Sequence, residues 1–211
     1  MNQNKIIYFL IVLFLIIGCK KVEKVYYPDG SLAAEYSIKN NKKEGIAYQY
    51  DKMGNKIAEM NYKNDFLDGF YYEYYPNGTI KSKIEYKENK KNGKAFYYDL
   101  KGNIVEELTY KNDTLNGIYK EYYSNTLIKK EGNYKNGKYD GAWYYYNEKG
   151  YLTGEGHFDN GNGELVSYYP YSDIIHSVTP FINNQKNGWE VVLSPNGDTL
   201  LKNYYENDIK I

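Results

Sequence analysis

The chain has little of what builds disulfides and metal sites. Its 211 residues include one cysteine, Cys19, and two histidines, His157 and His176. One cysteine cannot form an internal disulfide, and these three residues lack the spacing of zinc ligands. Lys plus Arg equals Asp plus Glu at 27 each, so no net charge draws the chain towards nucleic acid. These absences exclude a disulfide scaffold, a zinc domain and an electrostatic nucleic-acid binder.

Helical patterns are also scarce. After residue 25 no segment of useful length repeats its apolar residues at the helical period, and none is long enough for a crossover between parallel strands. Five prolines stand against 29 tyrosines and 19 glycines. Aromatic side chains fit a pleated, half-buried surface, and glycines permit tight turns. The composition therefore predicts an all-β protein.

The chain has a single long apolar run, near the N-terminus. Ile6–Ile17 is too short for a bilayer span, which needs about 20 residues, and it matches the apolar core of a signal peptide. The run leads into Ile16-Ile17-Gly18-Cys19, which resembles the bacterial lipobox. That resemblance implies that a signal helix within residues 1–18 is removed and that Cys19 carries a lipid, with residues 19–25 as an acylated tether. A plain N-terminal membrane anchor is the alternative.

Glycines recur along the chain with a 24-residue period. A first series is Gly45, Gly69, Gly93, Gly117 and Gly141; a second, with Thr126 in place of one glycine, is Gly30, Gly54, Gly78, Gly102 and Gly150. A fixed period of this length indicates one supersecondary unit repeated along the chain. Each unit of such an array buries its apolar surface against its neighbours. We therefore expect regular repeats over residues 26–162 and degenerate repeats over residues 163–211.

Alternation within each unit predicts two strands. Counted from the leading glycine of the first series, position +17 is Tyr or Phe in all five units and +15 is apolar or glycine, whereas +14 and +16 are polar. Residues two apart point to the same face of a strand, so the second strand has an aromatic face and a polar face. The first strand has aromatic residues at both +2 and +3. Some of its aromatic side chains must therefore lie on the other face.

Two kinds of reversal connect these strands. Within a unit, glycine or asparagine supplies the positive φ of a short turn, as in Pro76-Asn77-Gly78. A second reversal, Tyr62–Gly69 in one unit, joins consecutive units and ends at the leading glycine. We expect an elongated, twisted, single-layer antiparallel β-meander of hairpins, on the order of 65 Å long. Such a shape offers surface and no deep pocket.

The units resemble MORN repeats, in the bacterial variant found in antitoxins of the YwqK type. The motifs that carry the resemblance are Gly-x-x-x-x-Tyr, the turn glycine with an aliphatic residue two positions later, Tyr-Lys-Asn, and the closing Asn/Asp-Gly. The resemblance covers residues 26–160 and, more weakly, residues 189–207. It implies a rod of β-hairpins that serves as an interaction or membrane-associated module without catalytic residues. Because the motif is structural, no functional residue is carried over.

The sequence offers few residues that could form a catalytic or metal-binding site. His157 occupies the polar +16 position, where a solvated sheet residue is expected. Asp173, His176 and Ser177 lie along one short segment, whereas the members of a Ser-His-Asp triad converge from separate elements. Glutamates recur at +14, but Lys83 interrupts the row and neighbouring lysines balance its charge, which argues against a calcium site. We expect no catalysis, no cofactor and no metal.

Tyrosine ladders are the main candidate surface. Aromatic pairs across strands hold together a sheet that lacks a thick core. Rows of amphipathic rings also suit a protein partner or a glycan, and one ladder can serve both purposes. The candidate binding residues are Tyr72, Tyr74, Tyr98, Tyr122, Tyr144 and Tyr146.

Residues 163–188 break the regular pattern. They lose the turn glycine and contain Pro170 and Pro180. Terminal units of an array are atypical because they cap the stack, so a C-terminal cap is the first interpretation and a specific partner site is the alternative.

Together these patterns predict a protein of the bacterial cell envelope. It would be attached to the outer membrane through acylated Cys19, facing the periplasm, and its array would bind a protein partner, as an antitoxin or immunity protein does. The alternative is a platform that binds cell wall or glycan through the tyrosine ladders. Neither hypothesis involves nucleic acid.

Overall fold

The computed structural model describes residues 21–211; the expected signal helix at residues 1–18 and the lipidation site Cys19 lie outside them. The described residues form one sheet of 18 strands, without a helix. The strands are β1 (Lys21–Tyr26), β2 (Leu32–Lys39), β3 (Lys42–Tyr50), β4 (Lys56–Lys63), β5 (Phe66–Tyr74), β6 (Ile80–Lys87), β7 (Lys90–Tyr98), β8 (Ile104–Lys111), β9 (Thr114–Tyr122), β10 (Ile128–Lys135), β11 (Lys138–Tyr146), β12 (Leu152–Asp159), β13 (Asn162–Tyr168), β14 (Ile175–Ile182), β15 (Gln185–Lys186), β16 (Gly188–Leu193), β17 (Thr199–Glu206) and β18 (Ile209–Lys210).

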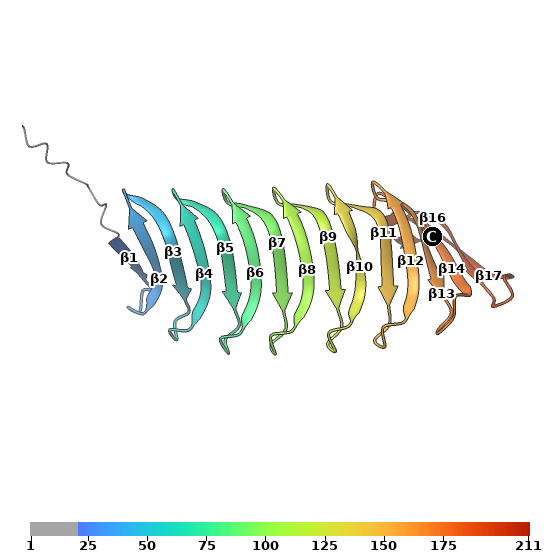
Figure 1. Ribbon diagram of the computed structural model, residues 1–211, viewed down its shortest axis with the longest axis horizontal. Coiled ribbons are helices and arrows are strands. Elements are labelled where there is room, and N and C mark those ends of the chain that lie inside the picture. The colour runs from blue at the N-terminus through green and yellow to red at the C-terminus, as the bar shows by residue number, and fades with distance from the viewer. Residues whose placement is uncertain (1–20) are drawn as a thin grey trace, which may run out of the picture.

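The strands form a meander in a single layer. From β1 to β15 each strand pairs antiparallel with the next, and β14 also pairs with β16, which continues to β17 and β18. Figure 1 shows the strands side by side along the longest axis of the molecule. At about 4.8 Å per strand, this arrangement is roughly 70 Å long. The expected single-layer all-β meander is confirmed; among residues 21–211 nothing forms a helix able to cross a membrane.

The start of the sheet differs from the expected tether at residues 19–25. Residues 21–25 belong to β1, which pairs with β2 from Lys21 opposite Ile38 to Tyr26 opposite Leu32. The physical reason lies in the repeat: Lys21 stands one full period before Gly45, so β1 is the first strand of an additional unit. Residues 21–25 therefore belong to the hairpin array.

The leading glycines lie inside strands. Gly69 lies within β5 and has a φ of 113°. Beside it Met60 pairs with Tyr71 and Tyr62 pairs with Leu67, so a step of two residues in β4 faces a step of four in β5. Such a bulge bends the strand, and because it adds an even number of residues, side chains on both sides of it keep their face. The expectation that the reversal extends to the leading glycine is corrected accordingly.

The reversals between units are two-residue turns that form one edge of the sheet, called here the tip edge. Asn64 and Asp65 have φ values of 51° and 72°, as a tight hairpin turn with two left-handed residues requires. The Asp65 N–H donates to the Lys43 carbonyl over 3.0 Å, and the Asp65 carboxylate accepts from the Lys43 N–H over 2.7 Å. A backbone bond to the preceding unit recurs at each later tip, so this edge is continuous along the array.

Longer turns form the opposite edge, called here the turn edge, and they alternate between two kinds. Tyr27, Tyr75 and Tyr123 begin turns of one kind, and each stands two repeat periods after the one before. Each donates its hydroxyl to a carbonyl at the start of the next turn: Tyr27 to Tyr50 (2.7 Å), Tyr75 to Tyr98 (2.9 Å) and Tyr123 to Tyr146 (2.8 Å). The intervening turns begin with Asp51, Asp99 and Asn147, whose side chains accept bonds within their own turn. The turn edge is thus joined in pairs of units.

The apolar core covers one face, called here the inner face. Ala95 at +2 lies opposite Leu108 at +15, and both are buried. Two of the larger +2 residues face a glycine at +15, Tyr119 opposite Gly132 and Trp143 opposite Gly156, whereas Tyr71 faces Ile84. A large side chain therefore faces a small one in several of the hairpins. Burial of +15, with +17 packed beside it, confirms the expected aromatic face of the second strand and places the +2 aromatic residues on the same side.

Candidate functional site

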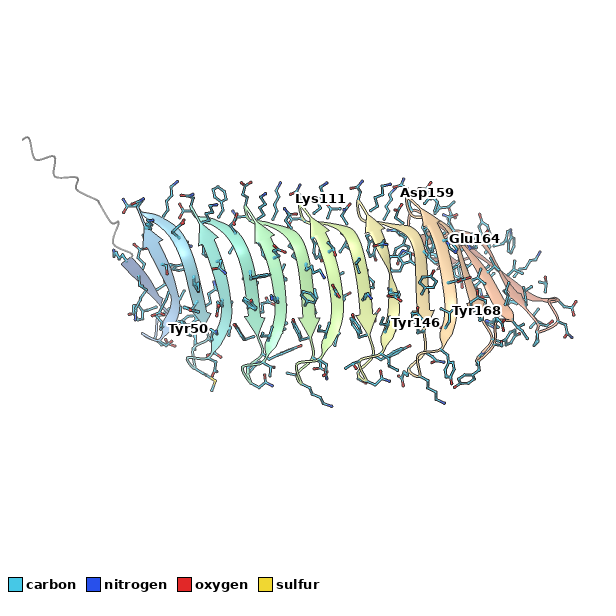
Figure 2. The ribbon with its side chains drawn as sticks, viewed as in Figure 1. Tyr50, Lys111, Tyr146, Asp159, Glu164 and Tyr168 are labelled. Carbon is cyan, nitrogen blue, oxygen red and sulfur yellow. The ribbon has the colours of Figure 1, made fainter. Side chains whose placement is uncertain are left out.

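All six predicted tyrosines lie on the opposite face, called here the outer face. Tyr72 and Tyr144 occupy +3, and the other four occupy +5, two residues further along the same strand. All six are half-buried. In Figure 2, Tyr50 and Tyr146, both at +5, lie towards the turn edge, whereas Lys111 lies at the tip edge. The structure therefore brings the predicted residues together in two parallel rows.

Hydrogen bonds tie some of the +5 tyrosines, Tyr74 and Tyr146 among the predicted ones, to the preceding unit. The Tyr74 hydroxyl donates to Glu59 Oε2 over 3.4 Å, and the Tyr146 hydroxyl donates to Glu131 Oε1 over 3.1 Å. In each case a +5 tyrosine reaches the +14 glutamate of the unit before it. Equivalent bonds join Tyr50 to Glu35 and Tyr168 to Glu155. These tyrosines thus join neighbouring units and are fixed in orientation.

Lysines balance the +14 glutamates. Lys56 Nζ lies 2.8 Å from Glu59, and Lys120 Nζ lies 3.1 Å from Glu131. The hydrogen bond to the carboxylate raises the pKa of each lysine. Lys56 Nζ also lies 4.3 Å from the centre of the Tyr74 ring. The carboxylate row therefore has lysine and tyrosine partners, and within residues 21–211 no group of His, Cys, Asp or Glu is arranged to hold a metal ion.

Burial keeps the +5 tyrosines protonated. Loss of hydration raises the pKa of Tyr74, Tyr98 and Tyr122, and raises the pKa of Tyr146 to about 12. Each hydroxyl therefore remains a hydrogen-bond donor throughout the physiological range. Because glutamate bonds hold Tyr74 and Tyr146 and Lys56 also contacts Tyr74, these two rings are already ordered for binding.

A row of exposed apolar side chains runs beside the tyrosines. Ile46, Phe70 and Ile118 occupy +1 and are 42%, 38% and 47% exposed, with Lys94 at the +1 position between Phe70 and Ile118. Between Ile118 and Tyr144 the outer face is hollowed by a shallow depression of about 400 Å³. Sequence reasoning missed this row. Its signal was the apolar residue directly after the leading glycine, a position that the sequence reasoning did not consider.

The two histidines lie in different surroundings. His157 is exposed on the outer face, as its +16 position predicts. His176 Nδ1 lies 3.5 Å from Ser167 Oγ, which in turn lies 2.6 Å from Ser177 Oγ. In the described part of the chain His176 has no hydrogen bond or ion pair to a carboxylate, so the group that would orient it in a triad is not in place there. Asp173 instead lines a depression at the turn edge.

A polar cluster occupies the inner face of the last unit. The Glu190 carboxylate accepts from Thr179 Oγ1 (3.0 Å), Asn203 Nδ2 (2.9 Å) and Lys186 Nζ (3.3 Å). Although burial alone would raise the pKa of Glu190, these partners lower it. Glu190 stands where earlier units carry Ala, Tyr or Trp at +2. The apolar core thus ends in a saturated polar network, which resembles the capping of a repeat array.

Comparison with known proteins identifies the repeat. Residues 21–40, 43–64, 67–88 and 91–112 match the family model described as MORN repeat variant, so the chain carries four such repeats. The segment 43–64 covers β3 from its second residue, the turn and β4, which is one hairpin. MORN repeats are generally modules for protein or membrane interaction. No curated protein matches the chain.

Two solved structures are slightly similar to this chain. The Tc holotoxin pore of Photorhabdus luminescens, with the TccC3-D651A mutation, is 14% identical over 88% of this chain and 13% of that chain, with a TM-score of 0.21. The crystal structure of TcdB2-TccC3-TEV is 14% identical over the same shares, with a TM-score of 0.23. The chain therefore spans only 13% of either solved chain. The likeness is too slight to bear on fold or function.

Proposed function

We propose that this protein is a lipid-anchored interaction module of the bacterial cell envelope, whose outer face binds a protein partner. The observation that carries the proposal is the exposed row of Ile46, Phe70 and Ile118 beside ordered tyrosines. Aromatic residues with a low density of free charge are typical of the centre of protein interfaces. The lysine and glutamate charges of this face already balance each other, so the partner need not be strongly charged.

Order in the tyrosine rows favours affinity. A rotatable side chain that becomes fixed on binding costs about 0.5–1.5 kcal/mol. Tyr74 and Tyr146 already donate to glutamates of the preceding units. Their immobilisation is thus a cost of folding and is not repeated on binding.

The anchor is proposed from the sequence alone. Cys19 lies outside the described residues, and β1 begins at Lys21, two residues later. Two extended residues span at most about 7 Å, so the array would begin at the surface of the outer membrane and extend into the periplasm. Replacing Cys19 by Ser should release the full chain from the membrane fraction and abolish incorporation of labelled fatty acid. If the unmodified chain incorporates no label and the variant stays in the membrane fraction, lipidation is contradicted and a plain anchor is favoured.

An antitoxin or immunity role is the finer form of the proposal and predicts one stoichiometric protein partner. The alternative, a glycan platform, needs accessible ring faces. Several are occupied: Lys56 lies over Tyr74, and Lys83 Nζ lies 4.3 Å from the Phe70 ring and 5.7 Å from the Tyr72 ring. A sugar would have to displace these lysines, so the outer face favours a protein.

Site-specific photo-crosslinking tests the proposed surface. A photoreactive amino acid is placed at Phe70 or Ile118 in the native envelope, and matched controls carry it at Met53 or Leu100, which are 88% and 60% exposed at the turn edge. We expect one protein to crosslink from the two outer-face positions and not from the controls. Equal crosslinking from all four positions, or binding of the purified chain to peptidoglycan alone, would refute the proposal.

A further inference from the structure

A second depression lies at the turn edge, where the regular repeats meet the degenerate ones. It has a volume of about 320 Å³ and is lined by Tyr151, Leu152, Tyr168, Tyr171, Ser172 and Asp173. Tyr151 follows the turn after β11, and Tyr171 lies in the turn after β13, so the two meet across neighbouring hairpins. The two rings are 52% and 62% exposed, far more than the half-buried rings of the outer face.

The rings of Tyr151 and Tyr171 form a corner. Their centres lie 5.0 Å apart and their planes meet at 85°. A compact ligand in such a corner touches two ring surfaces at once. We call this depression the aromatic corner.

The turn at Pro170 holds Tyr171 in a strained backbone conformation. Its φ is 58°, in the left-handed region that a tyrosine rarely adopts. Pro170 precedes it, and the Ser172 N–H donates to the Tyr169 carbonyl over 3.2 Å, which matches a turn whose third residue is normally glycine. Glycine does occupy the left-handed position of most other turns on this edge, for example Gly78. Strain of this kind is concentrated at functional sites.

Two carboxylates lie at or beside the aromatic corner. Asp173 lines it directly, and the Tyr168 hydroxyl donates to Glu155 Oε1 over 2.8 Å. Burial and Glu155 raise the pKa of Tyr168, and the nearby charge of Asp173 adds to the effect. Lys149 Nζ lies 5.4 Å from the centre of the Tyr171 ring, so this ring already attracts a cation, and a bound cation has to displace this lysine side chain.

From this arrangement we infer that the aromatic corner binds an organic cation, an alkylammonium or a guanidinium group, between Tyr151 and Tyr171 with Asp173 as its counter-charge. Ring faces attract such cations, and carboxylates strengthen the attraction. A neutral sugar fits less well, since it stacks on one ring face and needs free hydrogen-bonding groups. The Ser172 hydroxyl already donates to the Tyr169 carbonyl over 3.1 Å. This site does not depend on the proposed function of the outer face.

Ligand titration of the full chain, followed by NMR, tests the inference. The probes are choline, N-acetyl-arginine amide and N-acetylglucosamine, each at the same concentrations and ionic strength. We expect the two cations to bind and the sugar not to bind. Tighter choline binding would indicate a lipid headgroup as the natural source of the cation, and tighter arginine binding a protein side chain; either supports the site.

Variants separate binding from folding. Tyr171→Gly removes the ring and relieves the left-handed strain, so it should weaken cation binding about ten-fold while the melting temperature stays the same or rises. Asp173→Asn keeps the shape and should weaken binding by a few fold. Tyr26→Leu, at a 57% exposed tyrosine of β1, serves as the control and should bind as the unmodified chain does. Sugar binding as tight as cation binding, the absence of any binding, or full binding by Tyr171→Gly would overturn the inference.

Discussion

Replacing Trp143 by Ala should remove the largest single contribution to the core. Trp143 is fully buried, and its ring lies 4.4 Å from Tyr139, 5.1 Å from Tyr134 and 5.6 Å from Tyr119, measured between ring centres. Its Nε1–H donates to the Asn133 carbonyl over 3.0 Å. One side chain thus packs together residues of β9, β10 and β11.

The expected loss follows from these contacts. A buried Trp→Ala change costs about 3–5 kcal/mol in general. The three ring pairs add about 0.5–1.5 kcal/mol each beyond area burial, and the indole hydrogen bond adds about 1 kcal/mol, although such terms do not sum fully. We therefore expect a loss at the upper end of the range, about 5 kcal/mol. Because repeats interact only with neighbours, the units around β9–β12 should unfold first.

Urea denaturation measures this loss, and Trp189 supplies the control. The chain has two tryptophans, and Trp189 is 58% exposed, with one ring contact to Tyr204 at 5.1 Å. Trp189→Ala should cost less than about 1 kcal/mol, as exposed substitutions do. This variant also leaves Trp143 as the only fluorescent indole, a direct reporter of the core. A Trp143→Ala loss below about 2 kcal/mol, which is less than a buried leucine costs, or one equal to that of Trp189→Ala, would refute the packing argument.

Further outcomes follow from other contacts. Gly132→Ala should cost about 1–3 kcal/mol, because its Cβ would overlap the Trp143 ring, and much of this cost should vanish in the Trp143→Ala background, measured as a double-mutant cycle. Tyr75→Phe should lower unfolding free energy by about 1 kcal/mol through loss of the bond to the Tyr98 carbonyl; unchanged stability would contradict the paired turns. Tyr146 has a folded pKa of about 12 against 10.0 unfolded, so its contribution to stability is present below pH 10.0 and should be lost between these values; because burial raises the pKa of other tyrosines too, the difference in urea midpoint between the unmodified chain and Tyr146→Phe from pH 9 to 12 measures this. Glu190 has a lowered folded pKa, so its contribution is present above the ordinary glutamate pKa of 4.5 and should be lost as pH falls below it, and Glu190→Gln should flatten that acid limb of the urea midpoints.

Much of the fold follows from the sequence because each hairpin is specified locally. The 24-residue period and the alternation at +14 to +17 predict the second strand and its inner face correctly. The position of the leading glycine inside a strand was not predicted from the sequence. A positive φ suits a turn and a strand bulge equally, and only the pairing of Met60 with Tyr71 and of Tyr62 with Leu67 tells them apart.

The candidate surface was predicted only in part, because the spacing within a strand shows which residues share a face but not which residues of the neighbouring unit they contact. Spacing by two residues places Tyr72 and Tyr74 on one face without any structure. Their partners lie in a neighbouring unit: Tyr74 bonds to Glu59, 15 residues earlier in the chain. Such contacts depend on the register between hairpins. The aromatic corner depends on still more, because Tyr171 reaches Tyr151 only through the irregular turn at Pro170.

The two edges of the sheet constrain the sequence differently. From the tip at Asp65 to the tip at Gly161 the same backbone bond recurs every 24 residues, so this part of the tip edge is compatible with the 24-residue period; at the next tip the Asn184 N–H donates to the Gly161 carbonyl instead. On the turn edge, a tyrosine such as Tyr75 reaches the following turn, where Asp99 bonds within its own loop. A turn that begins with Asp or Asn has no hydroxyl to donate onwards, so the bond cannot run from every turn to the next. Tyr alternates with Asp or Asn at the first position of these turns, so the pattern repeats only after two periods. This alternation therefore indicates a repeating unit of two hairpins, which the spacing of the glycines alone does not show.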